Sequence, residues 1–92
     1  MDPNTRITRL DALVTTEVDG ELVGLDIEKG SCFGFNATAT RIWDLLDAPH
    51  TLGSLCDALM AEHEVDRATC LADTAAVVQM LAGEQLVVLT TP

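Results

Sequence analysis

The strongest constraint in this sequence is a change of hydrophobic period at residue 36. Before it lie short β-rich segments, one of which alternates between apolar and polar residues as a half-buried strand does. After it, apolar residues recur every three or four positions, as on one face of a helix. A chain of 92 residues has room for one domain. We therefore expect a small sheet followed by helices.

The first part of the chain is predicted to be a three-stranded antiparallel meander over residues 12–18, 21–28 and 32–35. Asp19-Gly20 is a strong two-residue hairpin signal, because both residues tolerate the left-handed backbone of such turns. Residues 29–31 make a second tight turn.

Alternation within residues 21–28 indicates one buried face and one wet face. The buried set is expected to be Val23, Leu25 and Ile27, and the wet set Gly24, Asp26 and Glu28. Residues 1–11 are polar and are expected to be a flexible N-terminus that precedes a single domain over residues 12–92.

The second part is predicted to hold three helices, with Asn36, Thr51 and Asp66 as their N-caps. Gly83 is expected to end the third helix. Residues 86–89 form either a short terminal strand or an apolar tail on the core. The fold class is therefore α+β with a winged helix-turn-helix-like outline: a three-stranded antiparallel N-terminal sheet, three helices and a possible short C-terminal strand. The core is expected to contain Trp43, Leu46, Leu55, Leu59, Leu71 and Val78.

The charge argues against two classes of partner. Five Lys and Arg against 15 Asp and Glu give a formal net charge of −10, and the five cations are scattered along the sequence. Nucleic acid and anionic membranes both require clustered cations. The N-terminus has no apolar stretch like that of a signal peptide, and three cysteines without a CxxC pair argue against a disulfide framework or a zinc ribbon. We expect a cytoplasmic protein whose cysteines are small buried residues.

Catalytic chemistry is not indicated. The two histidines, His50 and His63, lack carboxylates at metal-ligand spacing, and no serine lies in a nucleophile elbow. The glycines are spread as turn and cap residues rather than gathered in a phosphate-binding loop. The sequence therefore predicts no enzyme activity, no metal and no cofactor.

Two features favour peptide binding. The first is the predicted third strand, Cys32-Phe33-Gly34-Phe35. At a sheet edge its backbone could accept another strand, with Gly34 leaving room for the incoming backbone. The alternative is that Phe33 and Phe35 only pack in the core and Gly34 relieves crowding there.

The second feature is the third helix, which is more apolar than one packing face requires. The expected packing stripe is Leu71, Ala75, Val78 and Ala82, and the surplus is Cys70, Val77 and Leu81, bordered by Asp73, Met80 and Glu84. This surplus could be the wall of a peptide groove. The alternative is a helix covered on both sides, with residues 86–89 over the surplus.

Phe33-Gly34-Phe35-Asn36 is followed by small residues and then by Ile-Trp-Asp-Leu-Leu. Further segments follow in order, and the full set is Cys32 to Leu46, Thr51-Leu52, Glu64-Val65-Asp66, Asp73, Val77-Val78 and Gly83 to Leu86. In this ordered set the chain resembles the coenzyme PQQ synthesis protein D-like family, which has an aromatic–Gly–apolar–Asn strand end and then Ile-Trp-x-Leu-Leu. Its members are precursor-peptide recognition elements and include stand-alone lasso-peptide B1 proteins. Cys32 and His50 depart from the family's usual aromatic and basic residues.

The resemblance implies a non-catalytic domain that binds the leader segment of a ribosomally made precursor peptide. The leader would add a strand to the third strand, lie beside the third helix, and be delivered to a modifying or leader-cleaving enzyme of a lasso-peptide-like or PQQ-like pathway. Carried onto this chain, the peptide-binding residues would be Cys32, Phe33, Gly34, Phe35, Cys70, Asp73, Thr74, Val77, Met80, Leu81 and Glu84. Within this set, Cys70, Val77 and Leu81 would form the pocket floor. Asp73 and Glu84 would attract cationic leader residues. The alternatives are a homodimerising structural module and a winged-helix DNA-binding protein.

Overall fold

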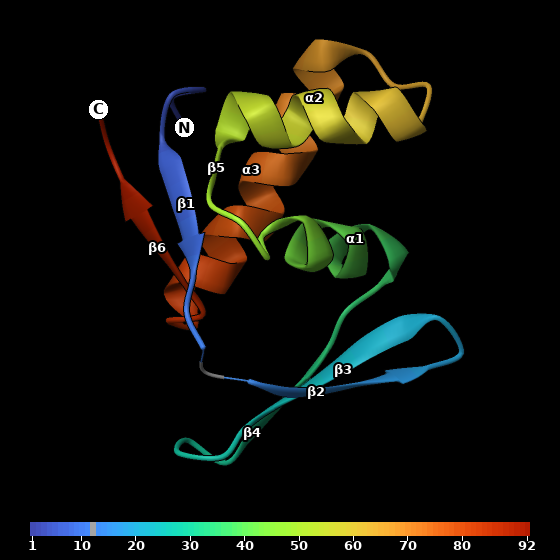
Figure 1. Cartoon of the computed structure of the whole chain (residues 1–92), viewed down its shortest axis with the longest axis vertical. Helices are drawn as coiled ribbons and strands as arrows, with labels where there is room; N and C mark the ends of the chain where they lie inside the picture. Colours follow the sequence, from blue (N-terminus) through green and yellow to red (C-terminus); the bar gives the residue numbers. More distant parts are fainter. Residues whose placement is uncertain (12) are drawn as a thin grey trace.

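The fold joins two small sheets through three helices, and it is described by a computed structural model over residues 1–11 and 13–92 (Figure 1). The elements in chain order are β1 (Arg6–Arg9), β2 (Val14–Val18), β3 (Glu21–Asp26), β4 (Ser31–Gly34), α1 (Ala37–Leu45), β5 (His50–Thr51), α2 (Leu52–Glu62), α3 (Arg67–Gly83) and β6 (Val87–Thr90). The predicted α+β class, with an N-terminal meander, three helices and a C-terminal strand, is confirmed.

The predicted meander is the sheet with strand order β2-β3-β4. Asp19 and Gly20 join β2 to β3 with φ values of 54° and 81°, so both lie in the left-handed region that the predicted turn requires. β2 begins at Val14, and residue 12, which the sequence placed in this strand, lies outside the described residues.

The prediction of which face of this sheet is buried is wrong. Leu25 is 43% exposed and Ile27 69% exposed, whereas Asp26 is only 4% exposed. The face of β3 that packs inward is the one that carries Gly24 and Asp26, because a glycine and a hydrogen-bonded carboxylate can both be buried there. A Cβ on Gly24 would lie 2.8 Å from Leu13 Cδ1, and the Asp26 carboxylate accepts the Lys29 N–H at 3.1 Å.

The N-terminal segment, for which the sequence predicts flexibility, contains a paired strand in the structure. β1 pairs antiparallel with β6, where Ile7 lies opposite Leu89, and with β5, where Ile7 lies opposite His50. Ile7 is fully buried. The same pairing shows that the C-terminal segment is a strand and not an apolar tail. This strand, β6, belongs to the β5-β1-β6 sheet and does not join the predicted meander.

The predicted helix caps are confirmed. Each side chain accepts the N–H three residues ahead: Asn36 from Ala39 at 2.8 Å, Thr51 from Ser54 at 3.0 Å, and Asp66 from Thr69 at 2.9 Å. The C-terminus of α3 differs in detail. Gly83 is the last helical residue, but the left-handed conformation falls on Gln85, with φ 62°.

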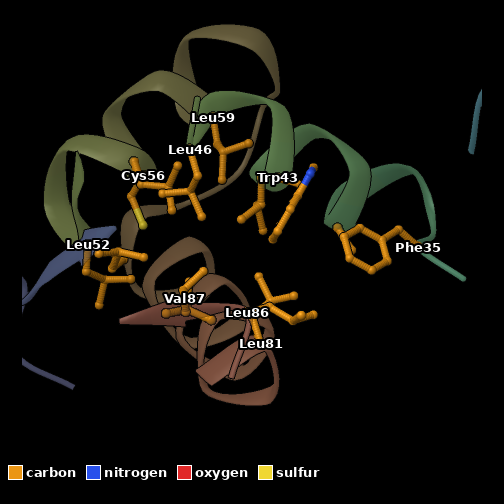
Figure 2. Packing of buried hydrophobic residues seen from close by; sticks show 14 of the residues in the cluster. Phe35, Trp43, Leu46, Leu52, Cys56, Leu59, Leu81, Leu86 and Val87 are labelled. Atoms are coloured by element: carbon orange, nitrogen blue, oxygen red, sulfur yellow. The ribbon is translucent and has the colours of Figure 1, made fainter. Parts of the chain in front are cut away.

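The core lies between the helices and the β5-β1-β6 sheet (Figure 2). Five of the six expected core residues are buried, namely Trp43, Leu46, Leu55, Leu59 and Val78, while Leu71 is half-buried against them. The Phe35 and Trp43 rings pack edge-to-face at one end of the cluster, with 5.6 Å between the ring centroids. The Leu22 N–H donates to Thr40 Oγ1 at 3.0 Å, which fastens the meander to α1.

Candidate functional site

β4 presents a free edge. It is an outer strand of the β2-β3-β4 sheet and pairs only with β3 among the described residues. The Phe35 N–H donates to Leu22 O at 2.8 Å, and the register continues with Phe33 opposite Gly24. Because hydrogen-bonded pairs alternate in an antiparallel ladder, the N–H and C=O groups of Cys32 and Gly34 point away from β3. These two residues offer their peptide groups to another strand.

The side chains of β4 divide between the two faces of the sheet. Phe35 is 3% exposed and Phe33 is half-buried against the core, whereas Cys32 and Gly34 are exposed on the opposite face. A Cβ on Gly34 would meet nothing within 4 Å. The alternative that Gly34 relieves crowding in the core is therefore wrong. Its lack of a side chain instead leaves the surface at this edge open.

The buried face of α3 is rotated from the predicted one. Its centre is formed by Cys70, Thr74, Val78 and Leu81, and Leu71, Ala75 and Ala82 are only partly buried. Leu81 is fully buried and Cys70 is 5% exposed, so both belong to the core rather than to an apolar surplus at the surface. Thr74 Oγ1 lies 3.9 Å from Cys70 Sγ.

On α3, the part of the predicted site that reaches the surface is a stripe, which we call the α3 stripe. It consists of Asp73, Val77, Met80 and Glu84, whose spacings of four, three and four residues place them on one side of the helix. Met80 is 45% exposed, Val77 is half-buried, and both acids are exposed. Neither carboxylate joins an ion pair within the described residues.

One hydrogen bond ties the turn before β4 to the end of the α3 stripe. Lys29 Nζ donates to Glu84 O at 2.9 Å. Figure 1 shows the β3–β4 turn below the C-terminal end of α3. The turn that leads into β4 therefore lies against the C-terminal end of α3, where the α3 stripe ends.

At the other end of the α3 stripe lies a cavity of about 170 Å³ between the three helices. It brings together three predicted site residues, Cys70, Asp73 and Thr74, with five that the sequence did not assign to the site: Thr38, Arg41, Leu59, His63 and Val65. Thr38 and Arg41 lie three residues apart on one side of α1, but no local pattern indicates that this side faces α3.

Arg41 is held at the rim of this cavity by Glu62. Its Nε and Nη2 donate to the two carboxylate oxygens at 2.5–3.0 Å. These hydrogen bonds lower the pKa of the Glu62 carboxyl. The pair therefore connects α1 to α2 beside the cavity. The Asp73 carboxylate, which also lines the cavity, has no ion-pair partner among the described residues.

The cysteines offer no reactive thiol in the core. Cys56 and Cys70 are buried and unbridged, as expected, while Cys32 is exposed on β4. Burial raises the pKa of the Cys56 thiol, which keeps it protonated and unreactive. Over residues 1–11 and 13–92, no group of three metal-ligating side chains gathers.

Comparisons with known proteins give the family. The family model for coenzyme PQQ synthesis protein D matches residues 21–87. No curated protein matches the chain.

Two solved structures resemble the chain over most of its length. One is TbiB1 in complex with the TbiA(beta) leader peptide, at 34% identity and a TM-score of 0.77, covering 87% of this chain and 93% of that one. The other is a lasso peptide synthetase B1 complexed with the leader peptide, at 28% identity and a TM-score of 0.74, covering 89% and 96%. The family match spans both the free edge of β4 and the α3 stripe, and the chain belongs to the coenzyme PQQ synthesis protein D family.

Proposed function

We propose that this chain binds the leader segment of a ribosomally made precursor peptide without catalysing a reaction on it. The leader adds a strand to β4 and lies along the α3 stripe. The chain then delivers the precursor to a modifying or leader-cleaving enzyme of a lasso-peptide-like pathway. The observation that carries this proposal is the free edge of β4, whose preceding turn is hydrogen-bonded to the end of the α3 stripe. The two similar structures that hold leader peptides support it.

Main-chain hydrogen bonds supply the affinity in this arrangement. The leader backbone pairs with the outward N–H and C=O groups of Cys32 and Gly34. Such bonds carry little sequence preference, so side chains must supply the specificity. Ordering a flexible leader costs conformational entropy, which holds the affinity to a moderate level.

The predicted site residues divide into contacting and supporting groups. Val77 and Met80 are exposed enough to contact apolar leader side chains, and Asp73 and Glu84 attract cationic ones. Leu81, Thr74 and Phe35 are buried and support the groove from beneath. The small cavity beside Cys70 and Asp73 receives one leader side chain at the end of the α3 stripe.

DNA binding, one of the alternatives, finds no favourable surface on α3. Arg67 is the only cation on α3, and its guanidinium donates to Asp57 at 2.6 Å. A recognition helix needs free cations for phosphates and bases. The homodimer alternative would use the same free edge of β4, so light scattering across concentration separates it from a monomeric peptide binder.

A proline at residue 32 tests strand addition. Cys32→Pro removes an N–H that points away from β3, a position at which an edge strand tolerates proline. We expect its affinity for the fluorescein-labelled leader of the precursor encoded beside the chain to fall about tenfold or more, measured by anisotropy. Cys32→Ala keeps the N–H and should bind like the wild type. Equal binding by all three proteins would place the leader elsewhere.

An aspartate on the α3 stripe tests the groove wall. Val77→Asp puts a charge against the apolar leader side chains, and we expect affinity for the same peptide to fall about tenfold. Gln79→Asp is the matched control, because it makes the same residue on an exposed position of α3 outside the stripe. If both variants lose affinity equally, the effect is one of net charge and the groove is wrongly assigned.

A further inference from the structure

The β2-β3-β4 sheet exposes an apolar face to solvent. Opposite the face that carries the buried Leu22 and Gly24, four apolar side chains are exposed: Val14, 59% exposed, Val18, 54%, Leu25, 43%, and Ile27, 69%. The register puts Val14 directly opposite Leu25, and Val18 lies four residues from Val14 on β2, which places it on the same face. Ile27 is in the turn after β3 and lines one cavity together with Val14. We call these four residues the outer face.

This clustering is more than scattered surface hydrophobicity. Among the described residues, the outer face holds four of the eight large hydrophobic side chains that are exposed. The alternation along β3 is regular enough that the sequence predicts burial of this face, yet none of the described residues covers it. Single exposed apolar residues are normal, whereas a contiguous patch indicates an interaction surface.

The outer face is hollowed at both ends. A cavity of about 390 Å³ at one end is lined by Val18, Asp19 and Glu21 and reaches Gly34 and Phe35 at the edge of β4. A cavity of about 400 Å³ at the other end is lined by Val14 and Ile27 together with Asp11 and Glu28. None of these four carboxylates joins an ion pair within the described residues.

We infer that the outer face docks the enzyme that acts on the leader, through a patch that is apolar in its centre and carries Lys or Arg at its rim. Charge complementarity favours this partner, since unpaired carboxylates line both hollows. A second copy of the chain fits less well, because each copy carries a net charge of −10 and the two would repel.

The outer face is also continuous with the proposed leader strand, so this inference rests on the proposed function. Cys32 lies opposite Leu25, and Gly34 lies opposite Val23, so both belong to the same side of the sheet. Every second side chain of a strand added to β4 projects on that side. The enzyme would therefore contact the outer face and alternate leader residues together, and would bind the loaded chain more tightly than the empty one.

The experiment measures two affinities for each protein. Anisotropy gives the affinity for the labelled leader peptide. Calorimetry gives the affinity of the chain, with and without leader, for the purified leader-modifying or leader-cleaving enzyme encoded beside it. The variants are Ile27→Lys and Val18→Lys, one at each end of the outer face. Val88→Lys is the matched control, because Val88 is 45% exposed on a strand of the other sheet. Circular dichroism checks that each variant is folded.

We expect Ile27→Lys and Val18→Lys to bind the leader like the wild type but to bind the enzyme about tenfold more weakly, with Val88→Lys unchanged in both. Unchanged enzyme affinity in all variants, with leader binding intact, would overturn the inference and leave the proposed function standing. A wild-type dimer that Ile27→Lys disperses, without effect on the enzyme, would make the outer face a self-interface and also overturn it. A wild type that does not bind the leader would defeat the proposed function itself.

Discussion

At the scale of single residues, Trp43 links three parts of the fold. Phe35 packs edge-on against its ring, and the Arg9 guanidinium lies 4.9 Å from the ring centroid. Arg9 Nη1 also donates to the Trp43 carbonyl at 3.0 Å. The indole therefore joins β1, the end of β4 and α1.

Removing the indole should destabilise the protein strongly. Trp43→Ala leaves a cavity in the core, and we expect the free energy of unfolding to fall by about 3–5 kcal/mol in urea, followed by circular dichroism. Trp43→Phe keeps an aromatic ring and should lose less. A loss below about 1 kcal/mol for the alanine variant would mean that the ring is not packed as described.

Asp73 should act on the rate of leader association. Its carboxylate is exposed on the α3 stripe and lies beside the small cavity. Asp73→Asn should slow association about two- to fourfold at low salt, while dissociation changes little, as stopped-flow fluorescence can measure. Glu64→Gln removes an equal charge from the exposed loop before α3. If both variants slow association equally, the local role of Asp73 is disproved.

At the scale of elements, we expect the burial of a single residue, Ile7, to hold β1 in its sheet. Ile7 is fully buried between β5 and β6, whereas Arg6 beside it is exposed. Ile7→Ala should therefore lower the free energy of unfolding by about 2–5 kcal/mol, and Arg6→Ala by less than about 0.5 kcal/mol. A flexible N-terminus would instead make both substitutions neutral in the same urea titration.

The elements that could be predicted from sequence are those specified locally. Asn36, Thr51 and Asp66 cap helices through hydrogen bonds to residues three positions away, and Asp19-Gly20 closes a hairpin alone. These signals need no knowledge of distant segments, and all of them are confirmed.

The errors occur where pairing is not local. The polar segment around Ile7 becomes a strand only because β5 and β6, more than 40 residues away, lie on either side of it. The inner face of β3 is decided by Leu13 packing on Gly24, which periodicity does not reveal. The rotation of α3 likewise depends on which neighbours it meets. For the site, the free edge and Gly34 could be predicted, but the cavity residues on α1 and α2 could not.

At the scale of the whole molecule, the charge of −10 has a definite consequence. Three of the five Lys and Arg residues pair with acids of the chain itself: Arg9 with Asp47, Arg41 with Glu62 and Arg67 with Asp57. The surface field is therefore strongly negative, which repels nucleic acid and attracts cationic peptides and proteins. No helix in the described parts of the chain has the length and apolarity that a membrane crossing requires.

The central claim is that the leader becomes the next strand beside β4, and amide hydrogen exchange measured residue by residue tests it most directly. The N–H groups of Cys32 and Gly34 point away from β3, whereas that of Phe35 already donates to Leu22. On leader binding, exchange at Cys32 and Gly34 should slow about tenfold or more, with little change at Phe35. A leader that binds yet leaves Cys32 and Gly34 exchanging as in the free protein would contradict strand addition on β4.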